Sequence, residues 1–144
     1  MRTRVLSSLA VVLVLALVTT ACSKKNGNES GGGTTTIAGQ KANDHGTKDV
    51  SGEGSAELEL DNDGNDYYFN PTILKGSAGE KLTLELSNEG SALHNFSITD
   101  QGISQDVESG TKAEVSVTFP QSGTLVFFCK YHQTLGMVGA LEVA

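Results

Sequence analysis

Residues 128–139 have the sequence FCKYHQTLGMVG, and this stretch decides how the rest of the chain is interpreted. It holds a cysteine, a histidine three residues later and a methionine five residues after that: Cys129, His132 and Met137. A thiolate, an imidazole and a thioether are therefore gathered in one short segment between two apolar runs. Donors of this softness suit copper in both of its common oxidation states, so the segment is a candidate metal-binding loop.

The run before this loop alternates with a period of two, which is typical of a β-strand. Phe127 and Cys129 share one face, and the other face, with Val126 and Phe128, is also apolar and is expected to be covered. The same alternation recurs at 58–60, 82–86, 94–98, 113–119 and 141–143. No helical period persists for three turns. We therefore expect an all-β domain, a sandwich of about seven to eight short strands in two packed sheets.

A second histidine is expected to point towards the same place. In the run LHNFSI at 93–98, His94 lies on the same face as Phe96 and Ile98, which must point into the core. Cys129 also points inward, at the last position before its strand turns. Alone, a buried cysteine is an ordinary small hydrophobe and a methionine an ordinary gap filler. Together with two histidines they predict a metal site at one end of the sandwich.

The spacing Cys-x2-His-x4-Met resembles the metal-binding loop of the cupredoxins, the blue (type 1) copper proteins, with loop lengths as in plastocyanin and pseudoazurin. The resemblance extends over residues 67–143. It includes FNP at 69–71, HNF at 94–96 and GMVG at 136–139. It implies a Greek-key β-sandwich. Lys130 and Tyr131 replace the small residue and the proline often found after the cysteine, which alters the surface of the site and leaves the ligand set intact.

The resemblance also implies a ligand set. His94, Cys129 and His132 would surround one copper ion, and Met137 would be a weak axial ligand. Asn95 would lie behind the ligands and join the two ligand-bearing segments by hydrogen bonds.

The function expected from this ligand set is one-electron transfer, and no enzymatic activity is expected. Electrons would enter and leave at the outer edge of His132, with Leu135 and Gly136 as a small apolar docking patch for weak encounters with redox proteins. Copper capture or delivery is the alternative, and zinc could also occupy three such ligands. Cys-His nucleophilic catalysis would leave His94 and Met137 without a role.

The start of the chain has the pattern of an export signal. Arg2 and Arg4 precede an apolar run at 5–18, so residues 1–21 are expected to be a signal peptide. The run ends in VTTAC at 18–22, which resembles a bacterial lipobox, and Cys22 is expected to carry a lipid after cleavage. An ordinary secretory cleavage site is the alternative. The protein would then be anchored to the outer face of the bacterial cell membrane, in the periplasm or at the cell surface. Cys129 would be left without a disulfide partner.

Residues 22–54 are rich in Gly, Ser, Thr, Asn, Lys and Asp, with Ile37 and Val50 as the larger apolar residues. Too few apolar side chains are present to form a core, so a flexible polar linker is expected, followed by a folded domain at 55–144. His45 falls in this linker and is assigned no role, because an isolated histidine there is expected to be solvated.

The charge of the chain is acidic, with a formal net charge of −7 at pH 7. Residues 55–144 carry four lysines against thirteen acidic residues, which argues against nucleic acid as a partner. The acidity either keeps an exported protein soluble or attracts a basic redox partner, and the sequence leaves both open. We expect a monomer.

Overall fold

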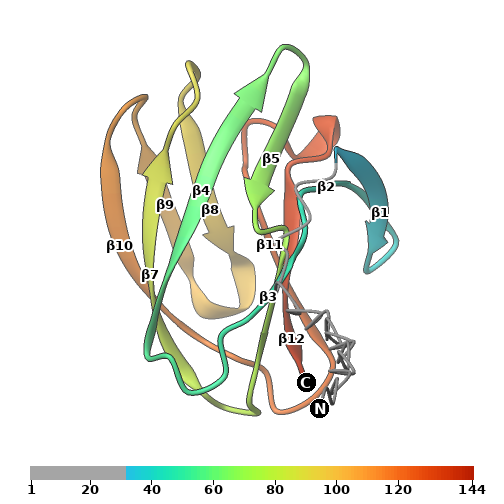
Figure 1. Cartoon of the computed structure of the whole chain (residues 1–144), viewed down its shortest axis with the longest axis vertical. Coiled ribbons are helices and arrows are strands. Elements are labelled where there is room, and N and C mark those ends of the chain that lie inside the picture. The colour runs from blue at the N-terminus through green and yellow to red at the C-terminus, as the bar shows by residue number, and fades with distance from the viewer. Residues whose placement is uncertain (1–31) are drawn as a thin grey trace, which may run out of the picture.

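The computed structural model describes residues 32–144 as two β-sheets packed face to face, with a hairpin at one side (Figure 1). The strands are β1 Gly33–Ile37, β2 Gln40–Asp44, β3 Thr47–Asp49, β4 Ser55–Asp63, β5 Asp66–Asn70, β6 Ile73–Gly76, β7 Lys81–Asn88, β8 His94–Ile98, β9 Ile103–Val107, β10 Lys112–Thr118, β11 Thr124–Phe128 and β12 Val138–Val143. Two short 3-10 turns, η1 Thr99–Gln101 and η2 Gln133–Leu135, complete the described elements. Within residues 32–144, no helix is long and apolar enough to cross a membrane.

The order of strands brings the predicted site segments together. One sheet has the order β10-β7-β4-β5 and the other β3-β6-β12-β11-β8-β9. β11 pairs antiparallel with β12 and with β8, so the strand that begins at His94 lies beside the strand that leads to Cys129. The predicted all-β sandwich is confirmed. The range 55–144 holds nine strands, β4 to β12, because the polar segments β5 and β9 also pair with their neighbours.

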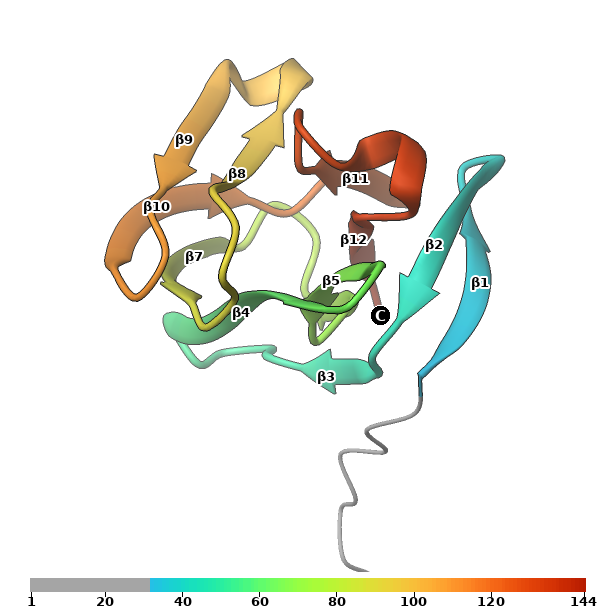
Figure 2. The same cartoon turned by 90° about the horizontal axis from the view of Figure 1, so that it is seen from above.

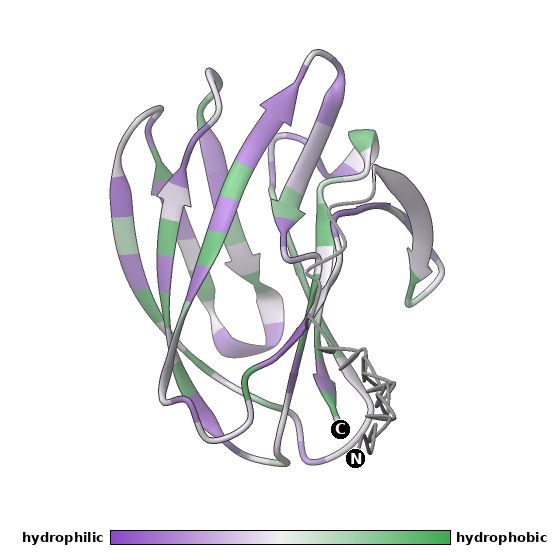
Figure 3. Ribbon diagram, viewed as in Figure 1, coloured by the Kyte–Doolittle hydropathy of each residue, from purple (hydrophilic) through white to green (hydrophobic). Residues whose placement is uncertain are grey.

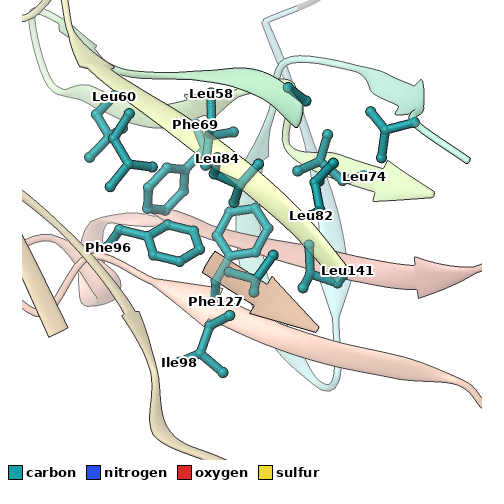
Figure 4. Close-up of a cluster of buried hydrophobic side chains, with 14 of the residues drawn as sticks. Leu58, Leu60, Phe69, Leu74, Leu82, Leu84, Phe96, Ile98, Phe127 and Leu141 are labelled. Carbon is teal, nitrogen blue, oxygen red and sulfur yellow. The ribbon is translucent and has the colours of Figure 1, made fainter. Parts of the chain in front are cut away.

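The core lies between the two sheets and follows from the alternation in the sequence. Hydrophobic and hydrophilic bands alternate along β4 and β7 (Figure 3), and their leucines are fully buried. From the opposite sheet, Phe96 and Phe127 pack against Phe69 with ring centroids 4.9 to 6.2 Å apart (Figure 4). Burial of this apolar surface is the main force that holds the sheets together. The predicted inward positions of Phe96, Ile98 and Phe127 are confirmed.

The predicted flexible linker is wrong over residues 33–49, which form strands. β1 and β2 pair as a hairpin, and β3 extends the larger sheet by pairing parallel with β6. Val50 is fully buried in the main core. These segments need no core of their own. β3 is held by backbone hydrogen bonds to β6, and the hairpin packs on the apolar outer face of the larger sheet. Residues 33–50 therefore belong to the same folded unit as residues 55–144.

The hairpin is the cover that the apolar outer face of β11 required. Ile37 and Ala42 are buried against Val138 and Ala140, and Val126 and Phe128 pack against this second cluster. The expectation that the outer face of β11 is covered is thus confirmed. Figure 2 shows the hairpin standing beside β12 and the connection that follows β11.

His45, expected to be solvated, is buried between strands β2 and β3. Its Nε2 lies 3.1 Å from Oδ2 of Asp66, and its ring stacks on Tyr68 with centroids 3.4 Å apart. No local pattern around His45 indicates these contacts, because both partners come from β5. The predicted signal peptide at 1–21, the lipid on Cys22 and the first part of the linker lie outside the described residues.

Candidate metal centre

The predicted metal-binding loop is the connection between β11 and β12, residues 129–137. Its two ends are tied by a hydrogen bond from the backbone N–H of Cys129 to the carbonyl of Met137 (3.1 Å). Inside the loop, the N–H groups of Leu135 and Met137 both donate to the carbonyl of His132, at 2.9 and 3.2 Å. The short turn η2 ends at Gly136, whose φ of 97° favours glycine. The loop is therefore a compact, hydrogen-bonded turn.

Three of the four predicted ligand residues lie together. His94, Cys129 and His132 each offer a donor atom, and these atoms lie within 4.8 Å of one another. Sγ of Cys129 is 3.4 Å from Nδ1 of His132. Met137 is fully buried in the same core cluster as Cys129 and is joined to it by the backbone bond at the neck of the loop. Two imidazoles and a thiolate at this spacing fit a single metal ion.

His94 provides the observation that most clearly points to a metal. It is fully buried, and among residues 32–144 neither of its ring nitrogens has a hydrogen-bond partner. A buried polar group without a partner destabilises a fold by roughly 1 to 3 kcal/mol. Burial, helped by the neighbouring His132, lowers the pKa of His94 to about 4. The imidazole is therefore neutral at pH 7, and a lone pair is available for a metal.

Cys129 is held in an environment that favours the thiol unless a cation is present. Burial raises the pKa of its side chain, while backbone N–H groups of Tyr131, Asn95 and His132 act in the opposite direction. A metal bound here would displace the proton, because coordination deprotonates a thiol outright. Within residues 32–144 Cys129 forms no disulfide. The residues present thus fit a soft, thiolate-binding metal ion.

Asn95 makes the contacts that its predicted role requires. Its Oδ1 accepts from the backbone N–H of Lys130 at 3.4 Å, and its Nδ2 donates to Oδ1 of Asp106 at 2.7 Å. Asp106 also accepts from the hydroxyl of Tyr131 at 3.0 Å and pairs with Nζ of Lys130 at 2.8 Å. Asn95 and Asp106 therefore join β8 and β9 to the two residues after Cys129.

The sequence analysis missed one aromatic neighbour of the site. The ring of Tyr67 stacks on the ring of His132, with centroids 4.1 Å apart and an angle of 20° between the planes. The same ring meets His94 edge to face at 6.2 Å. Tyr67 marks only the start of the cupredoxin resemblance, and a tyrosine in a short polar strand gives no local signal of this contact.

The surface around His132 differs from the prediction in one residue. His132 is half-buried, and Leu135 beside it is 51% exposed, as a docking patch would require. Gly136, expected in the same patch, is buried beneath Asn43 of the hairpin. Tyr131, at 44% exposed, is the second large apolar side chain on this surface.

The fold and the site together define a class of protein: an all-β sandwich with a buried cysteine and two histidines clustered where the β11–β12 loop meets β8. Comparison with known proteins supports this. The model of the cupredoxin-like domain family matches residues 10–141. The chain belongs to the cupredoxin-like family, whose members bind one copper ion, and the cluster of His94, Cys129 and His132 is where this chain can hold it.

Individual relatives agree with this assignment. Plastocyanin B'/B'' from Nicotiana tabacum is 31% identical over 99 residues, which cover 60% of this chain and 98% of that protein. Among solved structures, the copper-containing nitrite reductase from Thermus scotoductus aligns with a TM-score of 0.52 and 20% identity, over 62% of this chain and 27% of the enzyme. A heme-copper terminal oxidase also aligns with a TM-score of 0.52, at 18% identity, over 65% of this chain and 66% of that one. These two structures support the fold alone.

Proposed function

We propose that this protein is a membrane-tethered, extracytoplasmic carrier of single electrons, with His94, Cys129, His132 and Met137 as the ligands of one copper ion. The observation that carries this proposal is the buried imidazole of His94, which lies beside the sulfur of Cys129 and has no hydrogen-bond partner in the described part of the chain. Bound copper would supply the one-electron couple, because this ligand set suits both Cu(I) and Cu(II).

The chain's own residues supply the remaining requirements of a carrier. Two sheets and a hydrogen-bonded loop hold the donor atoms in place, so little structural rearrangement would accompany a change of charge. His94, Cys129 and Met137 are fully buried, which excludes water and keeps the local environment apolar. His132 alone of the four is partly exposed, so its ring is the shortest route between the site and a partner.

The exposed surface around His132 supports docking with another protein. Leu135 and Tyr131 are the exposed large apolar side chains of the described chain, and both flank this histidine in sequence. A patch of this size fits the small, weak interfaces that are typical of redox encounters.

Two other functions are less well supported. A copper-delivery protein would need ligands that a recipient can reach, whereas three of the four proposed ligands are fully buried. An enzyme would need a substrate to reach the metal, and the burial of these three ligands argues against such access.

Tethering through Cys22 follows from the sequence pattern at residues 18–22 and would keep the carrier near membrane-bound partners.

A visible spectrum of the copper-loaded full chain, purified in detergent, tests the proposed function. We expect an intense thiolate-to-copper charge-transfer band that disappears on reduction, returns on reoxidation and is absent in Cys129→Ser. Reversible cycling with the metal retained distinguishes a carrier from a delivery protein, which would surrender copper to a competing chelator. A colourless protein that binds one equivalent of Cu(II) would refute the proposed ligand set.

A further inference from the structure

The β1–β2 hairpin reaches the metal-binding loop as well as the outer face of β11 and β12. In Figure 2, β2 runs alongside the turn that carries η2. The contact centres on Asn43, a residue that is 7% exposed. Its backbone N–H donates to the carbonyl of Gly136 at 2.9 Å, and its side-chain Nδ2 donates to the carbonyl of Leu135 at 3.0 Å.

The same side-chain amide also bonds to a second segment. Nδ2 of Asn43 donates to the carbonyl of Tyr67 at 2.9 Å, so both hydrogens of the amide are used. Tyr67 is the residue whose ring stacks on His132. A single side chain therefore joins the strand that carries this aromatic ring to the loop segment between His132 and Met137.

The loop is shaped to receive this amide. A side chain at Gly136 would place its Cβ 2.6 Å from Oδ1 of Asn43, a distance at which atoms clash. Glycine is thus required at this position both by its φ and by the contact with Asn43. Gln40 of the same strand accepts at its Oε1 from Nε2 of Gln133 at 2.7 Å, which adds a third hydrogen bond between hairpin and loop.

We infer that Asn43 is a positioning residue that holds the metal-binding loop in one conformation, with His132 against Tyr67, whether or not metal is bound. Hydrogen bonds that fix a loop before binding reduce the ordering that binding requires. The consequence for copper retention rests on the proposed function, whereas the effect on the loop itself does not. The hairpin, which the sequence analysis placed in a flexible linker, thus becomes part of the architecture of the site.

Hydrogen exchange of the metal-free full chain tests the inference without any metal chemistry. In Asn43→Ala we expect the amides of Leu135, Gly136 and Met137 to exchange roughly ten-fold faster or more, because at least two hydrogen bonds that hold the loop are lost or weakened. Lys41→Ala is the matched control, since Lys41 is an exposed residue of the same strand and should leave these rates unchanged. Unchanged exchange in β4 and β7 shows that the fold is intact.

Unaltered loop exchange in Asn43→Ala would overturn the inference. If that variant does not fold, Asn43→Asp keeps the size of the side chain and removes the amide donor, so the same three amides can be compared. The second measurement is the rate at which copper passes from the protein to a chelator. This rate is expected to rise about ten-fold in the Asn43 variants and to stay unchanged in Lys41→Ala. If the wild-type protein lacks the charge-transfer band, the proposed function fails. The exchange result still decides the role of Asn43.

Discussion

Replacing His94 with leucine should stabilise the metal-free protein, although it removes a proposed ligand. The imidazole is fully buried and both ring nitrogens lack partners within residues 32–144. Leucine has a similar volume and no polar atoms, so His94→Leu removes the desolvation penalty without creating a large cavity. The expected gain is about 1 to 3 kcal/mol in the free energy of unfolding. For a domain of this size that corresponds to a rise of about 4 °C or more in Tm.

Copper should reverse this order of stability. A ligand at free concentration [L] that binds only the folded state raises the free energy of unfolding by RT ln(1 + [L]/Kd). Copper should therefore stabilise the wild-type protein strongly. His94→Leu loses a ligand and should gain little. Thermal or urea unfolding of both proteins, with and without one equivalent of copper, measures all four values.

His45 offers a matched control, because it is another largely buried histidine but has partners. Its Nε2 lies 3.1 Å from Asp66 and its ring stacks on Tyr68. His45→Leu should therefore destabilise the protein by about 1 to 2 kcal/mol and leave copper binding intact. If His94→Leu destabilised the metal-free protein as His45→Leu does, the argument that the His94 site is built for a metal would be wrong.

Three further predictions concern other parts of the chain. Met137→Leu should retain copper and raise the redox potential by roughly 50 to 100 mV. About 59 mV corresponds to a tenfold change in the equilibrium constant of a one-electron reduction. A marked loss of copper affinity in a chelator titration would show that the axial bond is stronger than proposed. Burial, with a hydrogen bond to Asp61, raises the pKa of Tyr68 to about 12. Because the pKa in the folded state lies above the unfolded value near 10, this stabilisation is complete below pH 10 and is lost between pH 10 and 12. Urea unfolding across that window should show a smaller decline in Tyr68→Phe, and equal declines would contradict the assignment. Cys22→Ala should abolish incorporation of a labelled fatty acid and release the protein from membranes, and a membrane-bound, unlabelled wild type would exclude the lipid anchor.

Much of the fold and site could be predicted because the patterns that indicate them, strand alternation and ligand spacing, lie between residues close together in the chain. A period of two determines which residues of a strand face the core, so the inward positions of His94, Phe96 and Phe127 follow from their immediate neighbours. The metal-binding loop could be located for the same reason, since three of its four proposed ligands lie within nine residues. The apolar outer face of β11 also predicted a cover, although not which segment supplies it.

The remaining features arise from contacts between residues distant in the chain. The sequence near Asn43 is polar and lacks the apolar side chains of a core, so its pattern predicts a linker. The segment is held in place by hydrogen bonds from Asn43 to Tyr67 and to Leu135 of the loop, which are 24 and 92 residues away in the chain. His45 and Tyr67 likewise gain their environments from partners on other strands. The sequence by itself determined an all-β chain with a soft-ligand loop and an inward histidine. The tertiary structure alone decided what covers that loop, because the backbone carbonyls of Leu135 and Gly136 carry no sequence signal that identifies the donor that will reach them.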